Sequence, residues 1–210
     1  MVQDQEKLKQ ILSGIIRLNI SVPAYDWLEK AKSASNAYQL NNNFVLVPRK
    51  IGKGTIEIEP GVIENLHIAR PGLSIKGWTI DRLSRVWLLL HINCSDRENY
   101  FKTIETLFLA AEVNELVALY SALPVLSYPE MWKARCAEGI RNNIGDVLMA
   151  IMCKNPYPSE NLDEAAWNQM VLKAFFTEKP IDEIIGLDER ANEKLAKTLS
   201  DYRHPKSSQN

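Results

Sequence analysis

The chain has 210 residues, of which 46% are hydrophobic and 24% are charged, a composition typical of a folded globular protein and not of a disordered one. Its 25 basic residues nearly balance its 26 acidic residues, and the net charge of -1 provides no general basic field, so we expect no nucleic-acid partner. The three cysteines, Cys94, Cys136 and Cys153, form no CxxC pair, which excludes a disulfide framework and the common zinc-binding patterns.

Apolar residues at helical spacing dominate the N-terminal part of the chain. The run from Leu8 to Ile16 predicts an amphipathic helix over residues 3–19. A second helix is predicted to begin near Pro23, which suits the first helical position, and to continue to about Tyr38.

Residues 41–58 have a different pattern. Three asparagines, Asn41–Asn43, are followed by Phe44–Val47, and Pro48 disfavours the α region for the residue before it. The alternation of Thr55–Ile58 fits either a short hairpin or a long loop. We therefore predict a small non-helical segment over 41–58.

Helix signals become regular after this segment. A short helix is predicted from Pro60 to Arg70, and the last helix from about Glu189 to Tyr202. Residues suited to cap the later helices recur along the chain: Thr79, Ser95, Ser127, Asn161 and Asp188.

Short helices joined by turns that contain proline predict an all-α fold of antiparallel helix pairs. Such pairs form either an irregular bundle or a short HEAT-like solenoid. We expect residues 1–204 to form a single helical domain and residues 205–210 to form a loose polar tail.

The helix predicted over Asn161–Phe176 is apolar nearly all round, yet it carries Asn168, Gln169 and Lys173. Two interpretations stay open. The three polar side chains line a ligand site, or they bond to loop backbone, particularly the turn Asn155–Pro158. Both interpretations predict that the three are substantially buried and hydrogen-bonded.

Two further polar groups are candidates for binding. Glu138, Arg141 and Asn143 form either an anion or carbonyl clamp built on Arg141, or a helix-end cluster in which Glu138 pairs with Arg141. Arg190 and Asn192 form either a polar lip on a groove or a solvated first helical turn.

Motifs for cofactors and for catalysis are missing from the sequence. No phosphate-binding loop, dinucleotide fingerprint or nucleophile elbow is present, so we predict no cofactor and nominate no catalytic residue. We also expect no signal peptide, because the first residues are polar. The longest apolar run, Val147–Cys153, is far shorter than the ~20 residues that span a bilayer, so we expect no transmembrane segment.

Several segments of the chain carry a resemblance to a known family. The most specific is the nine-residue block Ala166–Ala174. The other matching segments are Val47–Arg49 with Gly52-Lys53, Ala118–Pro124, Glu138–Asn143, Asn155–Pro158, Gly186–Asn192 and Asp201–His204. Together they resemble the EboA domain family.

The resemblance implies a bacterial protein of the Ebo cluster. That cluster also encodes a membrane prenyltransferase of the UbiA type and enzymes similar to sugar and cyclitol enzymes. It is associated with making a small metabolite and moving metabolites toward the periplasm. The resemblance therefore implies other Ebo-cluster proteins as partners and a cytoplasmic location, either free or peripheral at the inner membrane.

The leading functional hypothesis is a soluble, non-catalytic helical component of an Ebo-type biosynthesis and traffic pathway. It binds a partner protein or a largely apolar small metabolite. The alternative is an enzyme that acts on a small pathway intermediate through Glu138, Arg141 or Lys173. A third hypothesis is an adaptor that docks to the membrane prenyltransferase.

The sequence predicts that no transition metal binds stoichiometrically. The three histidines, His67, His91 and His204, lie far apart in the sequence, and the one pair at helical spacing, His91 with Cys94, has no further histidine or cysteine nearby to complete a metal site. Elemental analysis after chelator washing should find no metal at one equivalent per chain. One zinc or iron per chain would contradict the prediction.

Overall fold

The computed structural model describes residues 2–203, and it confirms the all-α fold. The structure is 70% helical, and its described residues contain no strand. Thr55 and Thr79 form one isolated antiparallel bridge. The predicted tail 205–210 and His204 lie outside the described residues.

The described chain contains twelve α-helices and three short 3-10 helices. The α-helices are α1 (Val2–Asn19), α2 (Val22–Ala31), α3 (Ala37–Ile51), α4 (Pro60–Ala69), α5 (Ile80–Leu89), α6 (Arg97–Ala110), α7 (Val113–Ala122), α8 (Lys133–Arg141), α9 (Gly145–Met152), α10 (Tyr157–Asn161), α11 (Glu164–Phe176) and α12 (Glu193–Arg203). The 3-10 helices are η1 (Leu123–Val125), η2 (Pro129–Trp132) and η3 (Ile181–Glu183).

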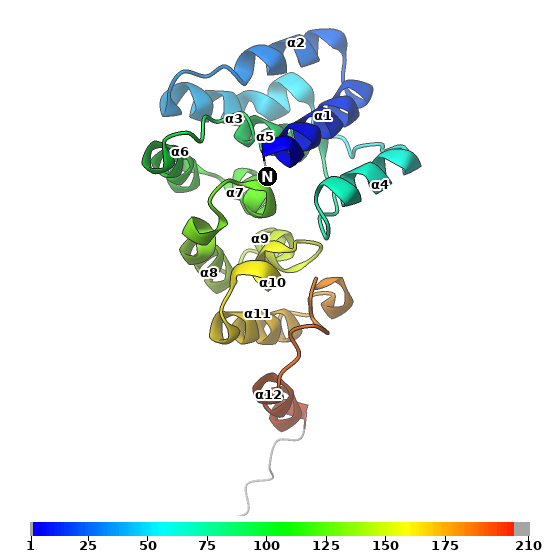
Figure 1. Ribbon diagram of the computed structural model, residues 1–210, viewed down its shortest axis with the longest axis vertical. Helices are drawn as coiled ribbons and strands as arrows, with labels where there is room; N and C mark the ends of the chain where they lie inside the picture. Colours follow the sequence, from blue (N-terminus) through cyan, green and yellow to red (C-terminus); the bar gives the residue numbers. More distant parts are fainter. Residues whose placement is uncertain (1, 204–210) are drawn as a thin grey trace, which may run out of the picture.

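Alternate helices form a row along the long axis of the molecule. Helix α5 packs on α7, α7 on α9, and α9 on α11, as Figure 1 shows from top to bottom. Helices α1, α2 and α3 cover the upper end of the row, and α12 lies at the opposite end (Figure 1). Helix α4 lies to one side, where it packs against α1.

Helix α5 is the central element, because α1, α3 and α7 all pack against it. Nine of its ten residues are buried, and they include Asp81 and Arg85. The Arg85 guanidinium donates to Asp81 at 2.9 Å and to the backbone oxygen of Phe44 on α3 at 3.0 Å, and it lies 3.8 Å from the Glu115 carboxylate on α7. One buried cation therefore joins three helices.

The non-helical segment is shorter than predicted, because residues 41–51 belong to α3. The Asn36 side chain caps this helix by accepting from the Gln39 backbone N–H at 2.9 Å. Leu40, Phe44 and Val47 recur on one buried face, and their packing overrides the weak local helix propensity. The chain leaves the helix at Gly52, whose φ of 102° lies in the region that favours glycine.

Several predicted helix boundaries are wrong by a few residues. The second helix ends at Ala31 and does not reach Tyr38. Asp96 and Asp163 replace the predicted Ser95 and Asn161 as capping residues, because each accepts the free backbone N–H three residues later.

The starts predicted at Ser127 and Asp188 are also wrong. Helix α8 begins at Lys133 after η2, and α12 begins at Glu193. The Asn155–Pro158 turn leads directly into α10, whose first turn accommodates Pro158 because that position needs no intrahelical N–H donor.

No helix in residues 2–203 is long and apolar enough to cross a membrane.

Replacing Arg85 with methionine should lower the free energy of unfolding by about 3–5 kcal/mol, because the change leaves the buried Asp81 and Glu115 carboxylates without their cation. Arg97→Met is the matched control, since the Arg97–Glu130 pair is about half exposed and such pairs contribute about 0–1 kcal/mol. Urea unfolding of both variants measures the difference. Equal losses would contradict the central role of Arg85.

Candidate functional site

Asn168, on the buried side of α11, is paired with Asn192. The Asn168 amide donates to Asn192 Oδ1 at 3.2 Å, and the Asn192 amide donates back to Asn168 Oδ1 at 2.8 Å. Asn192 Oδ1 also accepts from the Leu195 backbone N–H at 2.9 Å and so caps α12. The amide pair therefore fixes the start of α12 on α11.

Arg190 reinforces the same junction. One of its terminal nitrogens donates to the backbone oxygens of Pro158, Ser159 and Leu162 at 3.3, 3.0 and 2.8 Å. Its guanidinium carbon lies 4.8 Å from the centre of the Trp167 ring. The backbone oxygens near the end of α10 thus receive donors that the short helix cannot supply.

The predicted contact between the Asn168 side chain and the Asn155–Pro158 turn is wrong. That turn is held by Asn155 itself, which donates to the backbone oxygens of Tyr120 and Ala150 and accepts from the Tyr157 N–H. Asn168 instead bonds to another side chain, that of Asn192, although most buried side-chain polar groups bond to backbone.

The other two polar residues of α11 differ from each other. Lys173 is half-buried, and its ammonium donates to the Asn142 backbone oxygen at 2.5 Å, which satisfies a carbonyl beyond the end of α8. Gln169 is exposed, so the prediction that it is buried is wrong.

The pairing of Glu138 with Arg141 is also wrong. Glu138 pairs with Arg135 at 2.6 Å, and Arg135 binds Glu105 on α6 at 2.6 Å as well. Arg141 and Asn143 are exposed. The eight predicted site residues therefore do not form one site. Asn168, Arg190 and Asn192 meet at the α11–α12 junction, and Lys173 contacts the end of α8, the helix end that also carries Glu138, Arg141 and Asn143. Gln169 is exposed and joins neither group.

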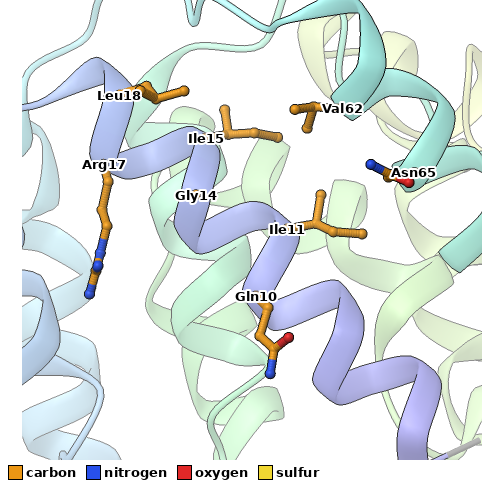
Figure 2. Close-up of a pocket in the computed structure, with 8 residues that line it drawn as sticks. All are labelled: Gln10, Ile11, Gly14, Ile15, Arg17, Leu18, Val62 and Asn65. Carbon is orange, nitrogen blue, oxygen red and sulfur yellow. The ribbon is translucent and has the colours of Figure 1, made fainter.

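A largely apolar groove lies elsewhere, between α1 and α4 (Figure 2). Its volume is about 450 Å³. In Figure 2, Ile11 and Ile15 project from α1 toward Val62 on α4. The full lining is Gln10, Ile11, Gly14, Ile15, Arg17, Leu18, Val62 and Asn65.

Gly14 leaves room in the wall of this groove. It lies within α1, and a Cβ atom placed on it would meet no heavy atom within 4 Å. Glycine inside a helix costs roughly 0.5–1 kcal/mol relative to alanine, so this position lowers helix stability while keeping the groove open. No sequence pattern indicates the groove, because Gly14 does not interrupt the apolar spacing of α1 and because α4 lies far from α1 in the sequence.

Both ends of α4 are anchored to other elements. Before α4, the Asn19 side chain donates to the Glu57 backbone oxygen at 2.9 Å and accepts from the Glu57 N–H at 2.7 Å. After α4, Arg70 donates to the Pro124 backbone oxygen at 2.7 Å and pairs with Glu160 at 2.5 Å. These anchors hold α4 at its distance from α1.

The fold is thus an all-α array of short helices in which alternate members form a row and a side helix encloses an apolar groove. The family model described as metabolite traffic protein EboA matches residues 8–210, and the chain belongs to the EboA family. A search of curated proteins and a search of solved structures gave no match.

Replacing Asn168 with alanine should lower the free energy of unfolding by about 1–3 kcal/mol, because the half-buried Asn192 side chain loses both of its hydrogen bonds to Asn168. Gln169→Ala on the exposed face of the same helix is the control, with an expected change within about 0.5 kcal/mol. Denaturant unfolding measures both values. Hydrogen exchange should show the loss of protection concentrated in α12, and unchanged exchange there would contradict the bracing role.

Proposed function

We propose that this EboA-family chain is a non-catalytic component of an Ebo-type metabolite biosynthesis and traffic pathway that carries a largely apolar small molecule in the α1–α4 groove. The observation that carries the proposal is the groove itself. Its volume of about 450 Å³ lies within the range of small-molecule sites, and most of its lining side chains are apolar.

The exposed apolar side chains of α1 and α4, in the lining and outside it, favour an apolar ligand. Leu18 is 66% exposed at the edge of the groove, and Ile63 and Ile68 on α4 are 49% and 61% exposed. Covering a fully exposed side chain of this kind contributes about 1.5–3 kcal/mol. Gln10 and Asn65 are the uncharged polar residues of the lining, and a side-chain amide can donate to and accept from a polar group of a ligand.

The chemistry of the lining favours binding over catalysis. Arg17 is the charged residue of the lining, and its guanidinium lies 4.4 Å from the Tyr25 ring and points away from Val62 and Asn65 in Figure 2. Within residues 2–203, no carboxylate, imidazole or thiol lines the groove to transfer a proton or attack a substrate. The groove therefore supports holding and releasing a molecule unchanged.

No observation comparable to the groove supports the alternative hypothesis of an enzyme that acts through Glu138, Arg141 or Lys173. Glu138 is bound by Arg135, the Lys173 ammonium by the Asn142 backbone oxygen, and Arg141 is exposed. None of the three lines the α1–α4 groove.

We place this carrier in the cytoplasm, where it hands its ligand to other Ebo-cluster proteins, including the membrane prenyltransferase. The exposed apolar side chains of α4 beside the groove support a transfer that proceeds through contact with a partner.

The neutral apolar fluorophore N-phenyl-1-naphthylamine tests the proposal. It should bind the wild-type chain, and Gly14→Leu should weaken binding by about tenfold or more because the new side chain fills the groove. Gly14→Ala is the matched control, and it should retain binding while raising stability by about 0.5–1 kcal/mol. Absence of binding to the wild-type chain, or equal binding by Gly14→Leu, would contradict the proposal.

A further inference from the structure

A second pocket lies where the first turns of α5, α7 and α9 meet. Its volume is about 320 Å³. Helix α5 contributes Asp81 and Arg82, α7 contributes Asn114 and Val117, and α9 contributes Asp146 and Met149, with Gly77 and Thr79 completing the lining. It shares no lining residue with the α1–α4 groove, and none of the eight residues predicted from the sequence lines it.

Arg82 is the cation of this pocket. Its Nε donates to Ser121 Oγ at 2.9 Å, and its guanidinium carbon lies 4.3 Å from the centre of the Trp78 ring. Among the described residues it forms no ion pair, so its two terminal nitrogens keep their donors for another group. Burial lowers the pKa of Arg82 to about 10, and the nearby Asp81 and Asp146 carboxylates oppose this shift.

Two carboxylates line the pocket, but they differ in what they bind. Asp81 is buried and its carboxylate accepts from Arg85 at 2.9 Å. Asp146 is exposed in the first turn of α9, and it forms no ion pair with any described residue. Arg82 and Asp146 therefore present opposite charges that do not contact each other across the pocket.

We infer that this pocket binds a free amino acid, with the ligand carboxylate on the terminal nitrogens of Arg82 and the ligand ammonium on the Asp146 carboxylate. Both ligand groups are charged at neutral pH, and a guanidinium binds a carboxylate through two parallel hydrogen bonds. Val117 and Met149 form the apolar wall that receives the ligand side chain.

The arrangement of charges selects for a zwitterion. A simple anion on Arg82 would be repelled by Asp146, and a simple amine on Asp146 would be repelled by Arg82. An amino acid satisfies both groups and replaces the hydration that Arg82 loses through burial. This site lies beyond the proposed apolar cargo of the α1–α4 groove and does not depend on it.

Isothermal titration of the full chain with the twenty free amino acids tests the inference. At least one should bind at concentrations up to about 10 mM, and its amide and its N-acetyl derivative should each bind about tenfold or more weakly, because each lacks one of the two charges. Absence of binding by every free amino acid would overturn the inference. So would equal binding by the amide or the N-acetyl derivative.

The variant Asp146→Asn decides the role of the pocket, because Asp146 is exposed and its replacement preserves the core. Affinity should fall about tenfold or more, whereas Glu164→Gln, which removes an exposed first-turn carboxylate from α11, should leave affinity unchanged. Gly14→Leu should also bind the amino acid normally, so the two sites fail independently. Unchanged affinity in Asp146→Asn would overturn the inference.

Discussion

The buried guanidinium of Arg85 is the interaction on which the arrangement of the central helices depends. It lies on α5 and binds groups from α3 and α7, and burial lowers its pKa while Asp81 and Glu115 oppose that shift. A buried ion pair is weak evidence for net stability, because desolvation offsets much of the attraction. Here the buried Arg85 guanidinium determines how α3 and α7 are positioned on α5. The three acceptor groups are satisfied together in one register of α3 and α7 on α5, and a slip of either helix leaves a buried charge unpaired.

Helix α5 also lines the second pocket, the one formed with α7 and α9. Arg85 points into the core and Arg82 points to the pocket, three residues earlier on α5. Asp81 lies near both cations, but its hydrogen bond goes to Arg85. The carboxylate of Asp81 is therefore already bound, and Asp146 is the carboxylate of the lining to which we assign the ligand ammonium in the inference above. First-turn positions of helices favour carboxylates, which explains why acidic residues gather at these three helix ends.

The sequence predicted the fold class and the family better than the boundaries and sites. Helices appear wherever apolar residues recur at helical spacing, but residues 41–51 were misassigned because burial of Phe44 and Val47 outweighs local strand-like signals. The burial of Asn168 was predictable from an almost wholly apolar helix, whereas its partner Asn192 lies 24 residues away and carries no signal of that contact. The sequence carries no signal of the α1–α4 groove or of the second pocket for the same reason, since each is assembled from helices distant in sequence.

Hydrogen bonds at both ends of α4, and the missing side chain at Gly14, keep the α1–α4 groove open. An apolar groove in water is unfavourable, and a free α4 would move toward α1 to bury Val62 and Leu18. The Asn19–Glu57 hydrogen bonds fix the segment before α4, and Arg70 fixes the segment after it, so closing the groove would break backbone-directed bonds at both ends. Gly14 contributes no side chain to fill the space. Under the proposed function, an apolar molecule that enters the groove relieves the unfavourable hydration of its walls, and this relief supplies the driving force for binding.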